Sequence, residues 1–232
     1  KSSIGDIDLH IFNEDVLSMD FAKTIGEKDG FHIVLGNPPY IGEKGNKSLF
    51  QAIRLKEFGE KYYERNMDYF YFFIYKAYEI LIQKGIIGYI TTNYFVTADG
   101  AKKLRGFLKS NLSFKEIINC NTLNLFDDAK GQHNMIFLLE KSQTKEPVRL
   151  INFSIDTINV KDLYEILLQE KQDLGIEIVK VHKDKLYDNK GQISIQYFGD
   201  DGKILEKIEK KGNYLLEDLC YINQGIVVGQ ID

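Results

Sequence analysis

The chain has 232 residues, of which 44% are hydrophobic, and carries a formal net charge of −4 at pH 7. This composition fits one large or two small globular domains with a substantial core. It excludes a polycation that coats nucleic acid without preference, although a local basic cleft remains compatible with the charge. The sequence shows neither an apolar stretch as long as a membrane span nor a signal-peptide pattern, so we expect a cytoplasmic protein without membrane contact.

Cysteine and histidine usage gives no sign of a metal site. Cys120 and Cys220 match no metal-ligand spacing, and the four histidines are scattered along the chain. Two such cysteines in a cytoplasmic protein are expected to be reduced thiols. Because the sequence begins at Lys1 without an initiating Met, we expect a fragment of a longer protein.

The first predicted elements are two short strands, each followed by polar residues. Asp8–Phe12 alternates like a strand and leads into Asp15-Val16-Leu17. Phe31–Gly36 is an apolar run typical of a buried strand, and Asn37-Pro38-Pro39-Tyr40 follows it directly. Each proline lacks a backbone N–H and fixes φ, so the chain must leave the sheet there. The sequence therefore predicts a rigid loop at the carboxyl end of a strand, where open α/β sheets place their sites.

Helices and strands alternate through the rest of the first 140 residues. Residues 41–66 are polar and basic and predict a loop that carries a helix over the site. Asp68 is a candidate N-cap for the next helix, and Lys84-Gly85 is its expected stop. The predicted helices are 69–83 and 100–110, and the predicted strands are 86–90, 114–120 and 134–139.

This order of elements predicts the fold class. Strands that alternate with helices favour a parallel sheet with crossovers. Only a loop separates the strands 114–120 and 134–139, so the last strand should run antiparallel. We therefore expect an α/β protein that resembles a partial Rossmann-like methyltransferase fold, with a mostly parallel sheet and a final antiparallel strand. Residues 146–232 predict an α+β C-terminal extension, with helices at 160–171 and 203–211 and strands at 176–181 and 193–198.

The loop Asn37-Pro38-Pro39-Tyr40 combines an amide, a carbonyl and an aromatic ring. It resembles the catalytic motif of amino-methyltransferases, which use S-adenosylmethionine to methylate an exocyclic or amide nitrogen. An aromatic amino group is a poor nucleophile, and the carbonyls of Asn37 and Pro38 can accept its two hydrogens. Tyr40 can stack on the target base. Holding the nitrogen in line with the methyl group makes the step intramolecular, so no strong base is required.

Four stretches in order resemble the N6-adenine DNA methyltransferases of type II restriction-modification systems, of the gamma motif order, including the fused type IIG enzymes. Asp15-Val16-Leu17 matches the acidic motif, and residues 31–40 match the strand and tetrad, although His32 stands where the family usually has Asp. Residues 67–90 match the helix–strand pair that follows. Asn124–Ala129 matches the segment whose Phe, here Phe126, stacks on the extruded adenine.

The resemblance implies the cofactor, the substrate and the site residues. Asp15, Val16 and Asn37 would bind S-adenosylmethionine, and Asn37 with Pro38, Pro39 and Tyr40 would be catalytic. Tyr40 and Phe126 would bind a flipped adenine of duplex DNA. The expected partners are DNA and a fused or separate restriction endonuclease. The family's glycine-rich cofactor loop is not found before residue 5, so we expect half a cofactor site and an inactive isolated fragment.

The resemblance also divides the chain. Residues 1–145 would form a partial methyltransferase catalytic domain, and residues 146–232 an accessory extension that leads into a truncated target-recognition domain. Two basic clusters are compatible either with phosphate contacts or with solvated helix faces. They consist of Lys44, Lys47, Arg54, Lys56 and Lys61, and of Lys102, Lys103, Arg105 and Lys109.

Other interpretations stay open. Release-factor glutamine methyltransferases and some ribosomal-RNA methyltransferases use a similar tetrad, although the basic insertion, the Phe126 segment and the C-terminal extension favour DNA. A non-catalytic scaffold or DNA-binding piece is a third possibility. Taken singly, Asp15 is also compatible with an ordinary turn residue, and Phe126 with a core aromatic under a loop.

Overall fold

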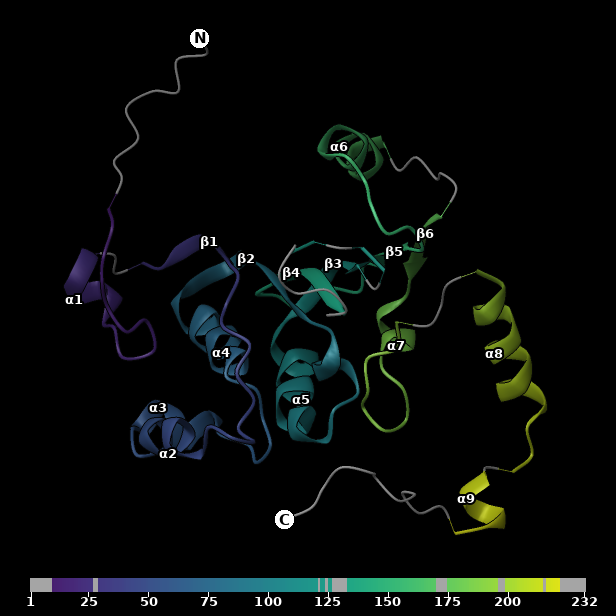
Figure 1. Ribbon diagram of the computed structural model, residues 1–232, viewed down its shortest axis with the longest axis horizontal. Helices are drawn as coiled ribbons and strands as arrows, with labels where there is room; N and C mark the ends of the chain where they lie inside the picture. Colours follow the sequence, from purple (N-terminus) through teal and green to yellow (C-terminus); the bar gives the residue numbers. More distant parts are fainter. Residues whose placement is uncertain are drawn as a thin grey trace. The chain divides into compact units, whose positions relative to one another are not determined.

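The computed structural model describes residues 10–26, 29–120, 122–123, 125–126, 133–169, 175–195, 199–214 and 216–221. The chain divides into two compact units, Lys1–Ile195 and Gln196–Asp232. The first unit contains α1 (Phe21–Ile25), β1 (Phe31–Gly36), α2 (Lys47–Arg54), α3 (Glu57–Tyr62), α4 (Phe70–Ile80), β2 (Leu81–Thr92), the 3-10 helices η1 (Tyr94–Val96) and η2 (Asp99–Ala101), α5 (Lys102–Asn111), β3 (Ser113–Cys120), β4 (Asn134–Glu140), β5 (Val148–Phe153), α6 (Val160–Gln169), β6 (Ile176–Val181) and α7 (Lys183–Leu186) (Figure 1). The second contains α8 (Gly199–Lys211) and α9 (Leu216–Leu219).

Six strands of the described chain form one sheet in the order β1-β2-β4-β3-β5-β6. β1 pairs with β2 in parallel, and β3 pairs with β5 in parallel. β4 lies antiparallel between β2 and β3, and β6 is antiparallel to β5. Thus β1, β2, β3 and β5 run in one direction, and the predicted mostly parallel α/β sheet with a reversed strand is confirmed.

One face of the sheet is buried under α4 and α5, and α6 lies on the other side (Figure 1). On the α4 side, Ile87 and Tyr89 of β2 pair with Leu139 and Phe137 of β4, and all four are buried. Burying such a side chain contributes about 1.5–3 kcal/mol. The buried residues of α4 are Phe70, Tyr71, Phe72, Ile74, Tyr75 and Ala77. This aromatic run therefore forms the core beneath the strands that carry the candidate site.

The helix α4 ends three residues before the predicted Gln83. Leu81 has an extended ψ of 142° and already pairs with Phe31 of β1. Lys141 Nζ donates to the carbonyls of Tyr78 and Leu81 at 2.8 and 2.6 Å. A cation at this end of a helix satisfies terminal carbonyls and opposes the negative end of the helix dipole. The strand β2 consequently begins earlier than the sequence pattern indicated.

The predicted single helix over the site is two short helices instead. Between α2 and α3, Lys56 adopts extended geometry with ψ 148°. The chain folds back so closely that a Cβ on Gly59 would lie 2.0 Å from the carbonyl oxygen of Ile53. Only glycine permits that approach. The two helices therefore pack against each other, as Figure 1 shows, rather than continuing as one.

Two other predicted strands differ from the structure. His10–Phe12 are not in a strand, and Asp8 and Leu9 lie outside the described residues. Residues 10–12 pair with no strand, and the Ile11 side chain is therefore exposed although the alternating pattern predicted that it would be buried. Of the predicted strand at 193–198, Ile193 forms an isolated bridge with Tyr187, and residues 196–198 lie outside the described part.

The sheet continues through the predicted boundary between residues 145 and 146. β5 and β6 extend it beyond β3, whereas the compact units divide between Ile195 and Gln196. The assignment of 1–145 as catalytic and of 146–232 as an extension leading into a target-recognition domain stays a prediction.

β1 is one of the two edge strands, and its outer edge pairs with no other strand among the described residues. Ile33 and Leu35 share one face of β1 and are 60% and 73% exposed. Parallel strands are normally buried on both faces and flanked by neighbours. The residues of β1 are thus as apolar as those of a buried strand, although Ile33 and Leu35 are exposed.

Candidate active site

The tetrad forms a compact hydrogen-bonded loop at the carboxyl end of β1. The Tyr40 hydroxyl lies 2.5 Å from Asn37 Oδ1 and 2.9 Å from the carbonyl oxygen of Ile90 in β2. Burial, and secondarily the charge of Asp68, raises the pKa of Tyr40 to about 12. The phenol therefore keeps its proton at neutral pH and can donate it to either oxygen. Pro38 is buried, whereas Asn37 is exposed.

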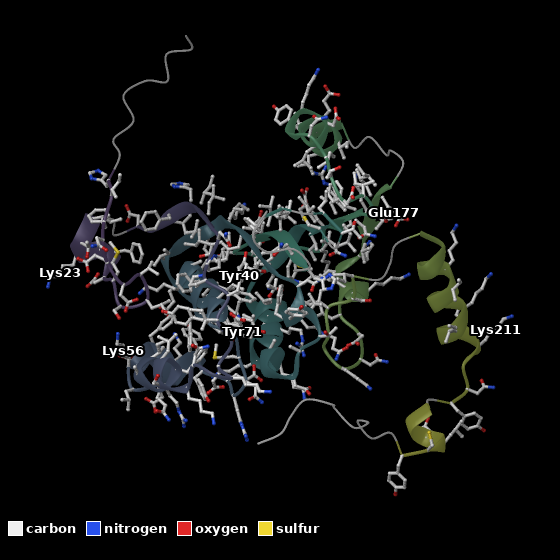
Figure 2. The ribbon with its side chains drawn as sticks, in the orientation of Figure 1. Lys23, Tyr40, Lys56, Tyr71, Glu177 and Lys211 are labelled. Carbon is white, nitrogen blue, oxygen red and sulfur yellow. The ribbon has the colours of Figure 1, made fainter. Side chains whose placement is uncertain are left out.

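The backbone after the tetrad is fixed to the start of α4. Ile41 N donates to Asp68 Oδ1 at 3.1 Å, and Tyr69 N donates to the Ile41 carbonyl at 2.8 Å. Asp68 Oδ1 also accepts from Phe70 N, the first residue of α4, at 3.3 Å, but the N-cap residue is Tyr69, one position after the Asp68 that the sequence suggested. The Tyr40 ring meets Phe70 edge to face, with centroids 6.2 Å apart. Together these contacts hold the loop in one position. In Figure 2, the labelled Tyr40 lies within the densely packed side chains of the first unit.

Asp15 begins a turn in which Ser18 N donates to its main-chain carbonyl at 3.0 Å. The Asp15 carboxylate accepts from Ser18 Oγ at 2.7 Å and from Leu17 N at 3.2 Å, and Lys56 Nζ lies 3.5 Å away. The hydrogen bond from Ser18 is the main cause that lowers the pKa of Asp15. Burial raises the pKa of Tyr69, and the negative charge of Asp15 adds to that rise. Asp15 is therefore close to the helix that anchors the tetrad loop.

Val16 and Phe126 are both partly buried. Phe126 follows β3, and because β3 runs parallel to β1, its segment begins at the same edge of the sheet as the tetrad. The ends of β2 and β4 lie between them. With about 4.8 Å between neighbouring strands, the ends of β1 and β3 are roughly 14 Å apart. A base held by both Tyr40 and Phe126 stays a prediction.

Among the described residues, two cavities of the first unit lie away from the tetrad, and neither is lined by Asp15 or Asn37. One, of about 450 Å³, lies beside the amino end of β1, where Phe31, Lys76 and Glu79 line it. The other, of about 520 Å³, lies beside α6. The tetrad is at the opposite end of β1 from the first cavity.

Arg105 corrects one expectation from the sequence. It is buried and donates to the carbonyls of Phe95, Ala98 and Gly191 at 2.8, 2.6 and 2.9 Å. Its guanidinium therefore fixes the loop after β2 rather than facing a phosphate. Lys103 likewise donates to main-chain carbonyls, at Lys61 and Tyr63.

The sequence carries no signal for the two contacts that organise the tetrad, from the Ile90 carbonyl and from Asp68. The Ile90 carbonyl belongs to a strand fifty residues later, and no sequence signal marks a main-chain acceptor. The position of Asp68 makes it a candidate N-cap, but its bond to Ile41 is a tertiary contact.

Within the described ranges, no group of three His, Cys, Asp or Glu could hold a metal ion. None of the helices described there is long and apolar enough to cross a membrane.

Comparison with known proteins gives consistent matches. M.BstVI, a type II methyltransferase of Geobacillus stearothermophilus, is 24% identical over 230 residues, which are 94% of this chain and 40% of that protein. RM.Eco57I, a type II restriction enzyme and methyltransferase of Escherichia coli, is 28% identical over 146 residues, 62% of this chain and 14% of that protein. The chain thus spans less than half the length of these curated relatives.

Solved structures show the same fold. The type IIG restriction endonuclease BpuSI superposes with a TM-score of 0.57 at 18% identity, over 85% of this chain and 24% of that one. The methyltransferase subunit of a type I restriction-modification system from Streptococcus thermophilus gives 0.53 at 18% identity, over 80% of this chain and 41% of that one.

The family comparison covers the tetrad and the strands around it. Residues 5–126, more than half of the chain, match the family described as Eco57I restriction-modification methylase. The resemblance to methyltransferases of type II restriction-modification systems is thereby confirmed, and the chain belongs to the Eco57I restriction-modification methylase family.

Proposed function

We propose that the protein containing this chain transfers a methyl group from S-adenosylmethionine to N6 of an adenine turned out of duplex DNA, within a restriction-modification system. The observation that carries this proposal is the hydrogen-bonded group of Tyr40, Asn37 and Ile90 at the carboxyl end of β1. It supports an acceptor site for an amino group, held at the sheet edge where α/β proteins bind ligands.

The chemistry follows from the lone pairs at the site. A carbonyl oxygen has two, so Asn37 Oδ1 can accept from Tyr40 and still accept one hydrogen of the target amino group. The Pro38 carbonyl would accept the other. These two bonds would leave the nitrogen lone pair available to attack the methyl carbon of a bound cofactor. As the carbon–nitrogen bond forms, the carbon–sulfur bond would break, its electron pair would stay on the departing thioether sulfur, and the amino group would release one proton to solvent. The cofactor, when bound, supplies the electrophilic methyl group.

The described residues fit part of such a cofactor. Among its contacts, the Asp15 carboxylate accepts from Ser18 and Leu17 and pairs with Lys56. A carboxylate has about four acceptor sites. Because the side chain is half exposed, it can accept a further hydrogen from a ribose hydroxyl or an adenine amino group. Asp15 and Val16 would hold that part of the cofactor, while Asn37 would lie near its methyl group.

DNA is favoured over RNA or protein glutamine as the substrate. M.BstVI, which matches 94% of this chain, is named a type II methyltransferase, and the resemblance to type II restriction-modification methyltransferases implies DNA as the substrate. Of the basic insertion after Tyr40, Lys44 and Lys47 are exposed and available to phosphates. A non-catalytic DNA-binding role for the chain is the competing proposal.

A transfer assay on the full-length protein tests the proposal. The protein is incubated with S-adenosylmethionine carrying a labelled methyl group and with duplex DNA, RNA or release factor. We expect label in DNA as N6-methyladenine. Label in RNA or in a glutamine side chain would replace the DNA proposal, and no label in any substrate would favour the non-catalytic role.

A further inference from the structure

Tyr94 is an aromatic residue that remains 59% exposed at the carboxyl end of β2. Its ring meets the exposed His133 edge to face, with centroids 6.5 Å apart and planes at 88°. Asn93 N donates to the His133 carbonyl at 2.9 Å, so the backbones of the two segments are joined as well. We refer to Tyr94 and His133 as the rim pair.

The turn that carries Tyr94 is rigidly held. Phe95, the next residue, is fully buried and packs edge to face on Phe70, which in turn contacts Tyr40. Arg105 donates to the carbonyl of Phe95, and Ile193 N donates to the carbonyl of Val96 at 2.9 Å. The exposure of Tyr94 is therefore a feature of a well-packed turn. A ring ordered in advance loses little conformational entropy when it binds a ligand.

The rim pair lies between the two segments expected to hold the target base. The sheet order β1-β2-β4-β3 places the end of β2 and the start of β4 between the tetrad loop and the Phe126 segment. Thr92 and Asn134 are the last paired residues of these two strands, and the rim pair follows immediately beyond them. DNA that delivers a base to the tetrad would approach this edge.

We propose that Tyr94 stacks on the base next to the target adenine, with His133 holding the orientation of the Tyr94 ring. The proposal rests on the proposed DNA methyltransferase function. A nucleotide turned out of a duplex leaves its neighbour without a stacking partner. An aromatic ring replaces that partner for any base, because every base has a π-face. Tyr94 would thus be a DNA-binding residue that stabilises the opened duplex without reading its sequence.

The test uses full-length protein and duplexes with 2-aminopurine at the target or at its neighbour, after the methylated adenine has been mapped with the wild type. Tyr94→Ala should weaken DNA binding about 5- to 150-fold, the range for one stacked base. It should also abolish the quenching of the neighbouring 2-aminopurine, while a target 2-aminopurine still becomes fluorescent. Tyr94→Phe should retain both properties, because stacking needs the ring and not the hydroxyl.

Tyr164→Ala is the matched control, since Tyr164 of α6 is 64% exposed on the other side of the sheet. It should leave binding and fluorescence unchanged. Unchanged DNA binding in Tyr94→Ala, or loss of the signal at the target rather than at its neighbour, would overturn the inference while leaving the methyltransferase proposal intact. A wild-type protein that methylates no DNA would overturn both.

Discussion

The hydroxyl of Tyr40 lies 2.5 Å from Oδ1 of Asn37, three residues earlier in the same loop. Pro38 and Pro39, which lie between them, restrict the backbone of the loop, and the Tyr40 hydroxyl lies within hydrogen-bond distance of the Asn37 side chain. Tyr40 therefore has a second capacity besides stacking, since it can orient the carbonyl that is expected to polarise the target amino group. Substitution of Tyr40 by Phe or by Ala distinguishes the two capacities, because only the Phe variant keeps a ring.

Asn37→Ala should reduce methyl transfer about 100- to 1000-fold in the full-length protein, the usual loss for a preorganised electrostatic partner. DNA binding should be largely retained, because phosphate contacts dominate affinity. Single-turnover transfer and a binding titration measure the two effects. Asn213→Ala, at an exposed asparagine of the second unit, is the control. Near-normal turnover in Asn37→Ala would contradict the catalytic assignment.

Tyr40→Phe should lower kcat by about 2- to 12-fold, the equivalent of one neutral hydrogen bond, with KM for DNA unchanged. The ring remains and can still stack, while the bond to Asn37 is lost. Tyr40→Ala should add a loss of DNA affinity. Steady-state kinetics of the two variants distinguish the orienting role of the Tyr40 hydroxyl from the stacking role of its ring. If Tyr40→Phe and Tyr40→Ala raise KM for DNA equally, the orienting role is contradicted.

Phe126→Ala should weaken base extrusion. Stacking on an aromatic ring is worth roughly 1–3 kcal/mol per base, so the variant should stabilise the extruded adenine much less. The measurement is the fluorescence of 2-aminopurine at the target position, which should be lower with the variant than with the wild type. A full fluorescence signal from the variant would assign Phe126 to ordinary packing instead.

Asp68→Ala should cost about 0.5–2 kcal/mol of stability, because Ile41 N and Phe70 N both lose their acceptor. Asp68→Asn keeps an acceptor oxygen and should cost less. Burial raises the pKa of Asp68, so the folded state binds its proton more tightly than the unfolded state does. This contribution to stability is present below the ordinary aspartate pKa and is lost as pH rises through the raised value.

Urea denaturation over a pH series checks both statements, and Asp68→Asn should remove that pH-dependent contribution. Asp99→Asn provides a control of opposite sign, because Lys102 lowers the pKa of Asp99. Stability from Asp99 is present above its ordinary pKa and is lost as pH falls. The same pH profile in both variants would show that Asp68 burial is not the cause.

The chain of residues 1–232 alone should bind S-adenosylmethionine weakly. Neither of the two cavities described above is lined by Asp15 or Asn37, and the outer edge of β1 pairs with no other strand among the described residues. A calorimetric titration of this chain beside the full-length protein measures the difference. Micromolar affinity for the chain by itself would refute the prediction.

Local sequence signals predicted the strands β1 to β4, the helices α4 and α5 between them, and the place of the tetrad. The apolar run 31–36 and the consecutive prolines are local signals, since backbone chemistry alone ends the strand there. The absence of a helical sequence pattern in residues 121–133 likewise predicted the reversal of β4, because a parallel connection needs a crossover.

The contacts between residues that are far apart in the sequence depend on the tertiary structure. The Ile90 carbonyl reaches Tyr40 because β1 pairs with β2, and Arg105 is buried because three carbonyls from two loops surround it. Neither contact has a local sequence signal. The isolated pattern at His10–Phe12 did not form a strand, because a strand requires a neighbour for its hydrogen bonds, and that neighbour is set by the fold rather than by the segment.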